Sequence, residues 1–165
     1  MAARFNGCTG AVGEAAVQLA RLFGAAVSGS CSAQAMERAR TIGVQKTFDY
    51  RTTDLATISD RFDVVYDTAG TMNVATGLHL LRKGGVFLDI NPTPGKFIRA
   101  ILNRRLKPII CTARTDILGG LASAAVEGKL RLPIAEIVPL TDAITMLTKL
   151  ERGHKFNGKV IVRMD

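Results

Sequence analysis

The sequence predicts an α/β fold in which a doubly wound, mainly parallel sheet is covered by helices. Two observations predict it. Short apolar segments alternate with segments whose apolar residues repeat at helical spacing. A glycine-containing turn, residues 7–13, stands between the first short segment and the first helical one. Because helices between strands imply right-handed crossovers, the strands should run parallel, with helices on both faces.

The helices are predicted from apolar stripes, caps and terminating glycines. Between Val12 and Phe23 the apolar residues recur on one face, and Gly24 follows as a C-terminal glycine. Ser32 can cap the second helix, and Gly43 ends it. The predicted helices are residues 11–23, 33–42, 73–81, 96–102, 117–127 and 142–152.

The strands are predicted from the short apolar segments that separate these helices. They are residues 2–6, 25–30, 46–49, 64–67, 86–90, 107–112, a segment near Ile137, and 159–163. Lys83, Gly84 and Gly85 are expected to turn the chain into the fifth of them. No internal repeat or flexible linker interrupts the series, so we expect residues 1–165 to form a single domain.

The composition is that of a globular chain: 47% of the 165 residues are hydrophobic. No apolar run reaches the roughly 18 residues of a membrane span, and the N-terminus does not have the pattern of a signal peptide. The three cysteines, Cys8, Cys31 and Cys111, are odd in number and widely spaced, which predicts neither a disulfide framework nor a metal site. We therefore expect a cytoplasmic protein with no membrane partner.

The net charge of +8 suits an anionic partner, either a nucleic acid or a phosphate-rich cofactor. The densest basic stretch, residues 99–107, has no interleaved aromatic residues and no nucleic-acid-binding motif. A solvated helix end is its plainer interpretation. We therefore expect no nucleic-acid partner.

The turn at residues 7–13 is the most informative motif. A dinucleotide fingerprint has glycines at its first, third and sixth positions, which here are Cys8, Gly10 and Gly13. Gly10 would let the backbone approach a pyrophosphate, and Gly13 would let helix and sheet pack closely. Any tight strand–helix turn also suits glycine, but the position between a strand and a helix favours a Rossmann-type dinucleotide-binding domain.

The end of the second strand indicates which cofactor would bind. An NAD-binding domain usually places Asp or Glu there for the ribose 2′-hydroxyl, and the nearest acid is Glu37, inside the next helix. Ser30 and Ser32 stand there instead, and their hydroxyls can donate to a 2′-phosphate. The pattern favours NADP, bound as NADPH, although Ser32 can equally serve as a plain helix cap.

Phrases along nearly the whole chain resemble the medium-chain dehydrogenase/reductase superfamily, in particular its zinc-independent quinone oxidoreductase branch. Residues 7–13 followed by 16–20 are similar to the phosphate loop and first helix of that branch. The other matching phrases, in order, are residues 31–32, 38–43, 49–50, 62–70, 83–85 and 153–160.

The resemblance implies an NADP-dependent oxidoreductase that reduces quinones, enones or related carbonyls. It implies that Gly13 and the loop Cys8, Thr9, Gly10, Ala11 and Val12 hold the pyrophosphate. Ser30 and Ser32 would face the adenosine ribose, with Tyr50 beside the adenine, although a partly buried packing role is the alternative for Tyr50. The nicotinamide end would lie near Thr68, Ala69, Gly70, Asn91 and Asn157. Relatives often form homodimers by pairing the edge strand equivalent to residues 107–112.

The sequence also departs from this pattern. Gln34 stands about where relatives often carry Lys or Arg for the 2′-phosphate, so Arg38 or Arg51 would have to replace it. The family's N-terminal catalytic domain, which helps to form the substrate cleft, has no counterpart in the sequence.

No catalytic constellation is evident. His79 and His154 are expected to be surface or packing residues, and Cys111 a core residue. We therefore expect the chain to bind cofactor and to be poorly active alone, and a non-catalytic nicotinamide-nucleotide sensor is the alternative function.

Overall fold

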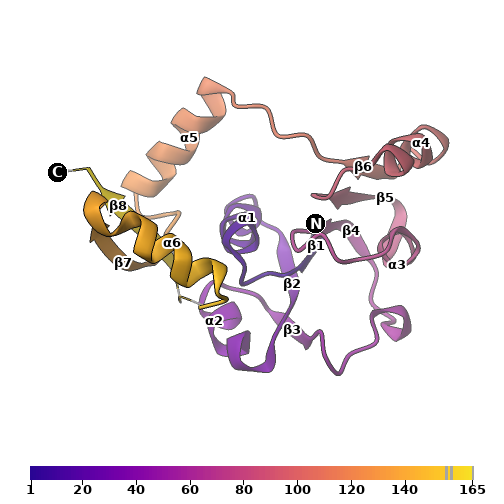
Figure 1. Ribbon diagram of the computed structural model, residues 1–165. Coiled ribbons are helices and arrows are strands. Elements are labelled where there is room, and N and C mark those ends of the chain that lie inside the picture. Colours follow the sequence, from indigo (N-terminus) through magenta and orange to yellow (C-terminus); the bar gives the residue numbers. More distant parts are fainter. Residues whose placement is uncertain (155, 157, 165) are drawn as a thin grey trace. The chain divides into compact units, whose positions relative to one another are not determined.

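The computed structural model of the protein describes residues 1–154, 156 and 158–164 (Figure 1). The chain divides into two compact units, Met1–Leu130 and Arg131–Asp165. The single domain over residues 1–165 stays a prediction.

The first unit contains a six-stranded sheet with the order β3-β2-β1-β4-β5-β6, and every pair of neighbours is parallel. The strands are β1 Ala2–Asn6, β2 Ala26–Cys31, β3 Lys46–Asp49, β4 Phe62–Asp67, β5 Leu81–Asp89 and β6 Leu106–Pro108. The strands after β1 lie first on one side of it and then on the other, so the winding of the chain reverses between β3 and β4. Ligands of such sheets bind at the carboxyl ends of the strands beside this reversal.

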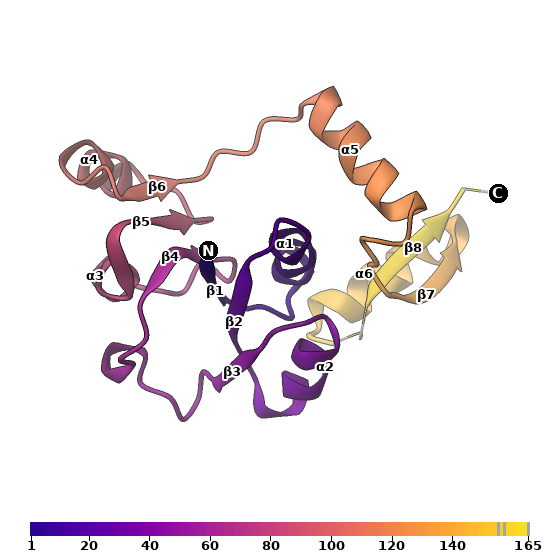
Figure 2. The ribbon, with the colours of Figure 1, turned by 180° about the vertical axis from the view of Figure 1, so that it is seen from behind.

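Helices cover both faces of this sheet. They are α1 Ala11–Leu22, α2 Met36–Thr41, α3 Val74–His79 and α4 Pro94–Leu102, with single 3₁₀ turns η1 Ala33–Ala35 and η2 Leu55–Thr57 (Figures 1 and 2). A fifth helix, α5 Thr115–Val126, follows β6 and has no buried residue. No helix in the described part of the chain is long and apolar enough to cross a bilayer.

Two separate apolar cores show which helix covers which face. Val17 of α1 and Ala39 of α2 share a core with Phe5 of β1, whereas Val74 of α3 shares another with Val65 and Phe87. Since neighbouring side chains in a strand point to opposite faces, and Val65 pairs with Arg4, the two cores lie on opposite faces. The predicted doubly wound α/β fold is confirmed.

The second unit consists of a two-stranded parallel sheet and one α-helix among its described residues. The strands β7 Ile134–Pro139 and β8 Lys159–Arg163 pair with each other, and η3 Leu140–Asp142 leads into α6 Ala143–Glu151 between them. The segment near Ile137 and residues 159–163 are therefore strands, as predicted, but they do not extend the six-stranded sheet.

The start of β5 differs from the prediction. Residues 73–81 were expected to be helical and residues 83–85 a turn, whereas α3 ends at His79 and β5 already begins at Leu81. The pairing of β5 with β4 shifts register between Phe62 and Val64, and Gly84 adopts φ +81° at that irregularity. A Cβ on Gly85 would lie 2.9 Å from the Asp63 carbonyl oxygen. The glycines thus form a bulge inside a strand, where the sequence suggests a turn before one.

The predicted strand at residues 107–112 is wrong in its extent, because β6 ends at Pro108. The last hydrogen bond to β5 is donated by the Ile109 N–H to the Asp89 carbonyl oxygen, where β5 itself ends. Beyond it there is no neighbouring strand to pair with, and Ile110 is 69% exposed. Cys111 is exposed for the same reason, which corrects the expectation that it belongs to the core.

Arg4, in the middle of β1, is a buried cation that the sequence pattern did not reveal. Its side chain is fully buried, and none of its three guanidinium nitrogens has a hydrogen-bond partner in the described chain. The guanidinium carbon lies 4.3 Å from the centre of the Phe48 ring and 5.7 Å from that of Phe62. Burial lowers the pKa of Arg4 to about 10, so the charged form is disfavoured inside the fold.

Replacement of this cation should stabilise the protein. The lowered pKa of Arg4 indicates that burial of its charge lowers the free energy of unfolding, and this loss is fully present below pH 10. The cation–π contacts recover only part of it. We expect Arg4→Met to raise the free energy of unfolding by about 1–3 kcal/mol at pH 7 in urea denaturation. The exposed Arg104→Met is the control and should change it by less than about 0.5 kcal/mol. A less stable Arg4→Met protein would contradict the interpretation.

Candidate functional site

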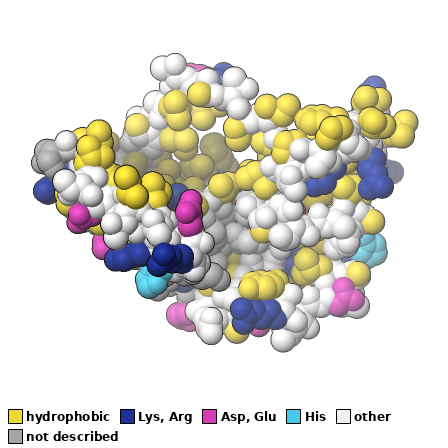
Figure 3. All heavy atoms as spheres, in the orientation of Figure 1, with side chains coloured by type: hydrophobic (Ala, Val, Ile, Leu, Met, Phe, Trp, Pro, Cys, Tyr) yellow, Lys and Arg dark blue, Asp and Glu magenta, His cyan; other side chains and the backbone are white. Residues whose placement is uncertain are grey.

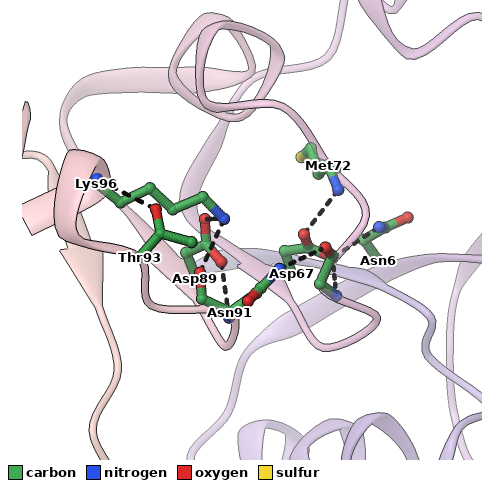
Figure 4. Close-up of polar contacts among 8 residues, drawn as sticks. Asn6, Asp67, Met72, Asp89, Asn91, Thr93 and Lys96 are labelled. Carbon is green, nitrogen blue, oxygen red and sulfur yellow. Dashed lines mark hydrogen bonds and ion pairs between the residues drawn. The ribbon is translucent and has the colours of Figure 1, made fainter.

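Asn6, the last residue of β1, connects three adjacent strands at the carboxyl edge of the sheet. Its Nδ2 donates to Asp67 Oδ1 at 2.8 Å, and its Oδ1 accepts from the Ser30 hydroxyl at 2.8 Å. All three side chains are buried. The ends of β1, β2 and β4 are therefore fixed to one another directly before the loop at residues 7–13. Figure 4 shows the contact between Asn6 and Asp67.

Asp67 also shapes the loop that follows β4. Its Oδ1 accepts from the Gly70 N–H at 3.0 Å and its Oδ2 from the Met72 N–H at 2.7 Å. The Thr68 hydroxyl donates to the Asn6 carbonyl oxygen at 2.6 Å. Thr68 and Gly70 are thus held beside the end of β1, and Ala69 between them is exposed.

Asp89 performs the same task at the end of β5. This buried carboxylate accepts from the Asn91 N–H at 2.9 Å and forms an ion pair with Lys96 Nζ at 2.6 Å. Lys96 Nζ donates in turn to the Asn91 carbonyl oxygen at 2.9 Å, and the Thr93 side chain caps α4 (Figure 4). Asn91 Nδ2 reaches the Gly70 carbonyl oxygen at 3.5 Å, so the loops after β4 and β5 lie next to each other.

The loop at residues 7–13 presents free backbone donors. The N–H groups of Gly7 and Cys8 donate to the Ser30 carbonyl oxygen, but those of Ala11, Val12 and Gly13 have no acceptor among the described residues. No side chain caps α1, and Gly10, Ala11 and Val12 are exposed. Three N–H groups and the positive end of a 12-residue helix form a site suited to an anion.

Gly13 allows α1 to lie against this loop. A Cβ on Gly13 would lie 2.1 Å from the Gly7 carbonyl oxygen and 3.0 Å from Cys8 Cα, both backbone atoms. A Cβ on Gly10 would be 3.3 Å from the same carbonyl oxygen. The two glycines therefore stand where the sequence interpretation requires them, at the points of closest backbone approach.

Cys8 occupies the position where the fingerprint has its first glycine. Its side chain is fully buried and faces Gly29 of β2, on which a Cβ would lie 2.6 Å from Cys8 Sγ. Burial and a hydrogen bond with the Cys31 thiol raise the pKa of Cys8 to about 12. Cys8 can therefore contribute backbone to a ligand site but not a reactive thiolate.

The ends of β2 and β3 place the residues expected near the adenosine ribose. The Ser30 hydroxyl is fully buried and bound to Asn6, so the structure gives it a structural partner in place of the expected phosphate. Ser32 is partly exposed, and although it precedes η1 its side chain makes no capping hydrogen bond. The Tyr50 N–H donates to the Cys31 carbonyl oxygen at 3.2 Å, and 52% of Tyr50 is exposed. Ser32 and Tyr50 thus lie at neighbouring strand ends with accessible side chains.

Asn157 and the two histidines complete the residues that the sequence singled out. Asn157 is outside the described residues. His79 is exposed, with its Nε2 3.1 Å from an Arg61 nitrogen, and the His154 ring lies against Phe156. Among the described residues, no group of three or more His, Cys, Asp or Glu side chains could hold a metal ion.

Sequence reasoning missed the residues that position the site, namely Asn6, Asp67 and Lys96. A signal was present for the first two, because each is a polar residue at the carboxyl end of a predicted strand. Side chains at the carboxyl ends of adjacent parallel strands converge on one edge, so buried polar partners are expected there. Lys96 had no such signal, since its partner depends on how the chain turns after β5.

A substitution at Gly13 should damage the loop. We expect Gly13→Ala to lower the free energy of unfolding by about 1–3 kcal/mol in urea denaturation, because the added Cβ meets backbone that must shift. Gly119→Ala in α5 is the matched control: its Cβ meets nothing within 4 Å, so stability should stay unchanged or rise by up to about 1 kcal/mol. Equal effects of both substitutions would contradict the packing argument.

Comparisons with known proteins identify the family of the chain. The sequence model of the family described as "Zinc-binding dehydrogenase" matches residues 42–162. The chain is 28% identical over 164 residues to a chloroplast envelope quinone oxidoreductase homolog of Arabidopsis thaliana. The matched segment covers 93% of this chain and 50% of that relative. It is 28% identical over 160 residues to the NADPH-dependent alkenal/one oxidoreductase of the same plant, covering 93% of this chain and 38% of that protein.

Solved structures show the same fold. The quinone oxidoreductase of Coxiella burnetii superimposes with a TM-score of 0.82 at 26% identity, covering 99% of this chain and 53% of that one. A 2-haloacrylate reductase, at 22% identity and a TM-score of 0.81, shares the fold. The chain spans about half the length of the quinone oxidoreductase relatives that it matches. With the family matched over residues 42–162, the chain belongs to the zinc-binding dehydrogenase family of the medium-chain dehydrogenase/reductases.

Proposed function

We propose that the chain is the cofactor-binding portion of an NADPH-dependent oxidoreductase that reduces quinones, enones or related carbonyls. The observation that carries the proposal is the exposed loop at the start of α1, whose Ala11, Val12 and Gly13 N–H groups have no acceptor in the described chain. This loop stands at the carboxyl edge of β1, where the winding of the sheet reverses. A pyrophosphate is the ligand that such a loop holds in dinucleotide-binding domains.

The residues present fit the proposed cofactor. The backbone from Cys8 to Gly13, including Thr9 and Gly10, would bind the pyrophosphate, and the close approach at Gly13 keeps the loop in position. The bound cofactor would supply the hydride that the reaction needs. Thr68, Ala69, Gly70 and Asn91 would border the nicotinamide end, since Asp67 and Asp89 hold these two loops at adjacent strand ends. Asn157 remains a proposed contact on sequence grounds alone.

The preference for NADPH over NADH rests on the end of β2. No carboxylate stands there, and Ser32 offers a partly exposed hydroxyl without a capping bond. A carboxylate would bind the 2′-hydroxyl of NADH and repel a 2′-phosphate. The relative in Arabidopsis named as an NADPH-dependent alkenal/one oxidoreductase supports the same preference.

The proposed substrate class rests on the names of the relatives. The expectation of low activity rests on the geometry that hydride transfer requires. The relatives are named as a quinone oxidoreductase homolog, an alkenal/one oxidoreductase and a trans-enoyl reductase. Hydride transfer requires donor and acceptor at roughly 3–3.5 Å in alignment. We expect the other half of the enzyme to hold the acceptor, so that this chain alone binds cofactor and turns over slowly.

The test is a fluorescence titration with NADPH, followed by assays of quinone and enone reduction. The assays compare this chain with a longer protein that carries the family's N-terminal catalytic domain. NADPH binding by this chain and turnover by the longer protein are expected. Equal turnover by both would show that a complete site lies in these residues. Binding without turnover by either would favour a nicotinamide-nucleotide sensor, and the absence of binding would end the proposal.

A carboxylate at the end of β2 should reverse the cofactor preference. Cys31 is buried, so the accessible Ser32 is the position to change. We expect Ser32→Asp to weaken NADPH binding by about tenfold or more through charge repulsion, with NADH bound equally or more tightly. Ser123→Asp, exposed on α5, should leave both affinities unchanged. Similar losses for both nucleotides in Ser32→Asp would argue against a 2′-phosphate beside this residue.

We also propose that two copies pair through β6. This strand is at the edge of the sheet, and the exposed residues 110–112 follow it without a partner strand. An unpaired edge is a template for pairing with a second chain. We expect a dimer in sedimentation at high protein concentration and a shift towards monomer for Ile110→Lys. Phe23→Lys, which alters another exposed apolar residue at the end of α1, should remain dimeric. A parent chain that is entirely monomeric would rule the dimer out.

A further inference from the structure

The proposed function leaves open which cation binds the 2′-phosphate, and the structure separates the candidates. Arg38 of α2 is already engaged, since its guanidinium contacts the buried Glu14 carboxylate at 2.5 Å. Arg40 lies 3.4 Å from Glu37 within the same helix. Arg51, by contrast, is exposed, and its guanidinium has no carboxylate partner among the described residues. Of these three arginines, Arg51 is the one whose guanidinium has no carboxylate contact within the described part of the chain.

The backbone brings Arg51 to the end of β2. Cys31 and Asp49 are paired in register, and the Tyr50 N–H then donates to the Cys31 carbonyl oxygen at 3.2 Å. Arg51 follows directly, and its N–H donates to Asp49 Oδ1 at 3.0 Å, which fixes the turn. The Asp49 carboxylate is thereby bound to the Arg51 backbone. Ser32, the first residue after β2, is thus beside the turn that carries Tyr50 and Arg51.

The Tyr50 ring supports the guanidinium of Arg51. The guanidinium carbon lies 5.6 Å from the ring centre, within the range of a cation–π contact. A contact of this kind reduces the freedom of a long side chain, so that less entropy is lost when it binds an anion. An aromatic ring beneath a cation also offers a flat surface beside the place proposed for the adenine.

We propose that Arg51, held by the Tyr50 ring, binds the 2′-phosphate of NADPH together with the Ser32 hydroxyl, and so determines the choice between NADPH and NADH. The inference rests on the proposed function. A guanidinium is well suited to the site, because it stays charged and offers two parallel N–H donors to phosphate oxygens. NADH lacks this phosphate, so its affinity should not depend on Arg51.

The experiment titrates the 165-residue chain and its Arg51→Met variant with NADPH and with NADH, followed by nucleotide fluorescence. We expect Arg51→Met to weaken NADPH binding by about tenfold or more, the loss typical of a charge-assisted hydrogen bond, and to change NADH binding by less than about twofold. Unchanged NADH binding also shows that the variant is folded. Arg104→Met, exposed between α4 and β6, removes the same charge elsewhere and should leave both affinities unchanged.

Variants of Tyr50 test the supporting ring. Tyr50→Phe keeps the ring and should retain the NADPH preference, whereas Tyr50→Leu should lose part of it. If the Arg51→Met variant binds NADPH as tightly as the parent chain, or loses affinity for NADPH and NADH equally, the assignment of Arg51 is overturned. The proposed function is left intact by either result. A parent chain that binds neither nucleotide would overturn both.

Discussion

The hydrogen bond from the Asn6 amide to the Asp67 carboxylate is the contact on which the rest of the candidate site depends. It lies between the two central strands, and the same amide oxygen accepts from Ser30 of β2. Asp67 receives two further backbone N–H groups, so its buried charge is compensated by three donors. Loss of one donor would leave part of a buried charge unsatisfied, at a cost of roughly 1–3 kcal/mol. The loop at residues 7–13 begins directly after Asn6, so its position is set by this network.

A second buried carboxylate, Asp89, fixes the loop after β5, and it does so through an ion pair. Its partner Lys96 belongs to the first turn of α4, so a helix and a loop are joined by one ion pair. The contact from Asn91 to the Gly70 carbonyl oxygen then connects the two loops. Both loops proposed for the nicotinamide end are therefore held by buried acids at strand ends.

The sequence was sufficient for features that depend on local pattern. The alternation of segments predicted the sheet, and Gly10 and Gly13 predicted the close backbone approach in the loop at residues 7–13. Features that depend on tertiary partners were not predictable. The strand after Lys107 ends early because β5 ends at Asp89, and Ser30 is buried because Asn6 reaches it. Arg4 was unremarkable in a short strand, since only the fold shows that it has Phe48 as a neighbour and no hydrogen-bond partner in the described chain.

The contact between Cys8 and Gly29 has a consequence for how this sequence can change over evolutionary time. The sulfur occupies the space that a side chain at position 29 would need, so a larger residue can enter β2 only after position 8 has become smaller. A lineage that first enlarges residue 29 passes through an overpacked intermediate, whereas the opposite order passes through a small void. The two positions are therefore expected to vary together, and the order of exchange is constrained by volume alone.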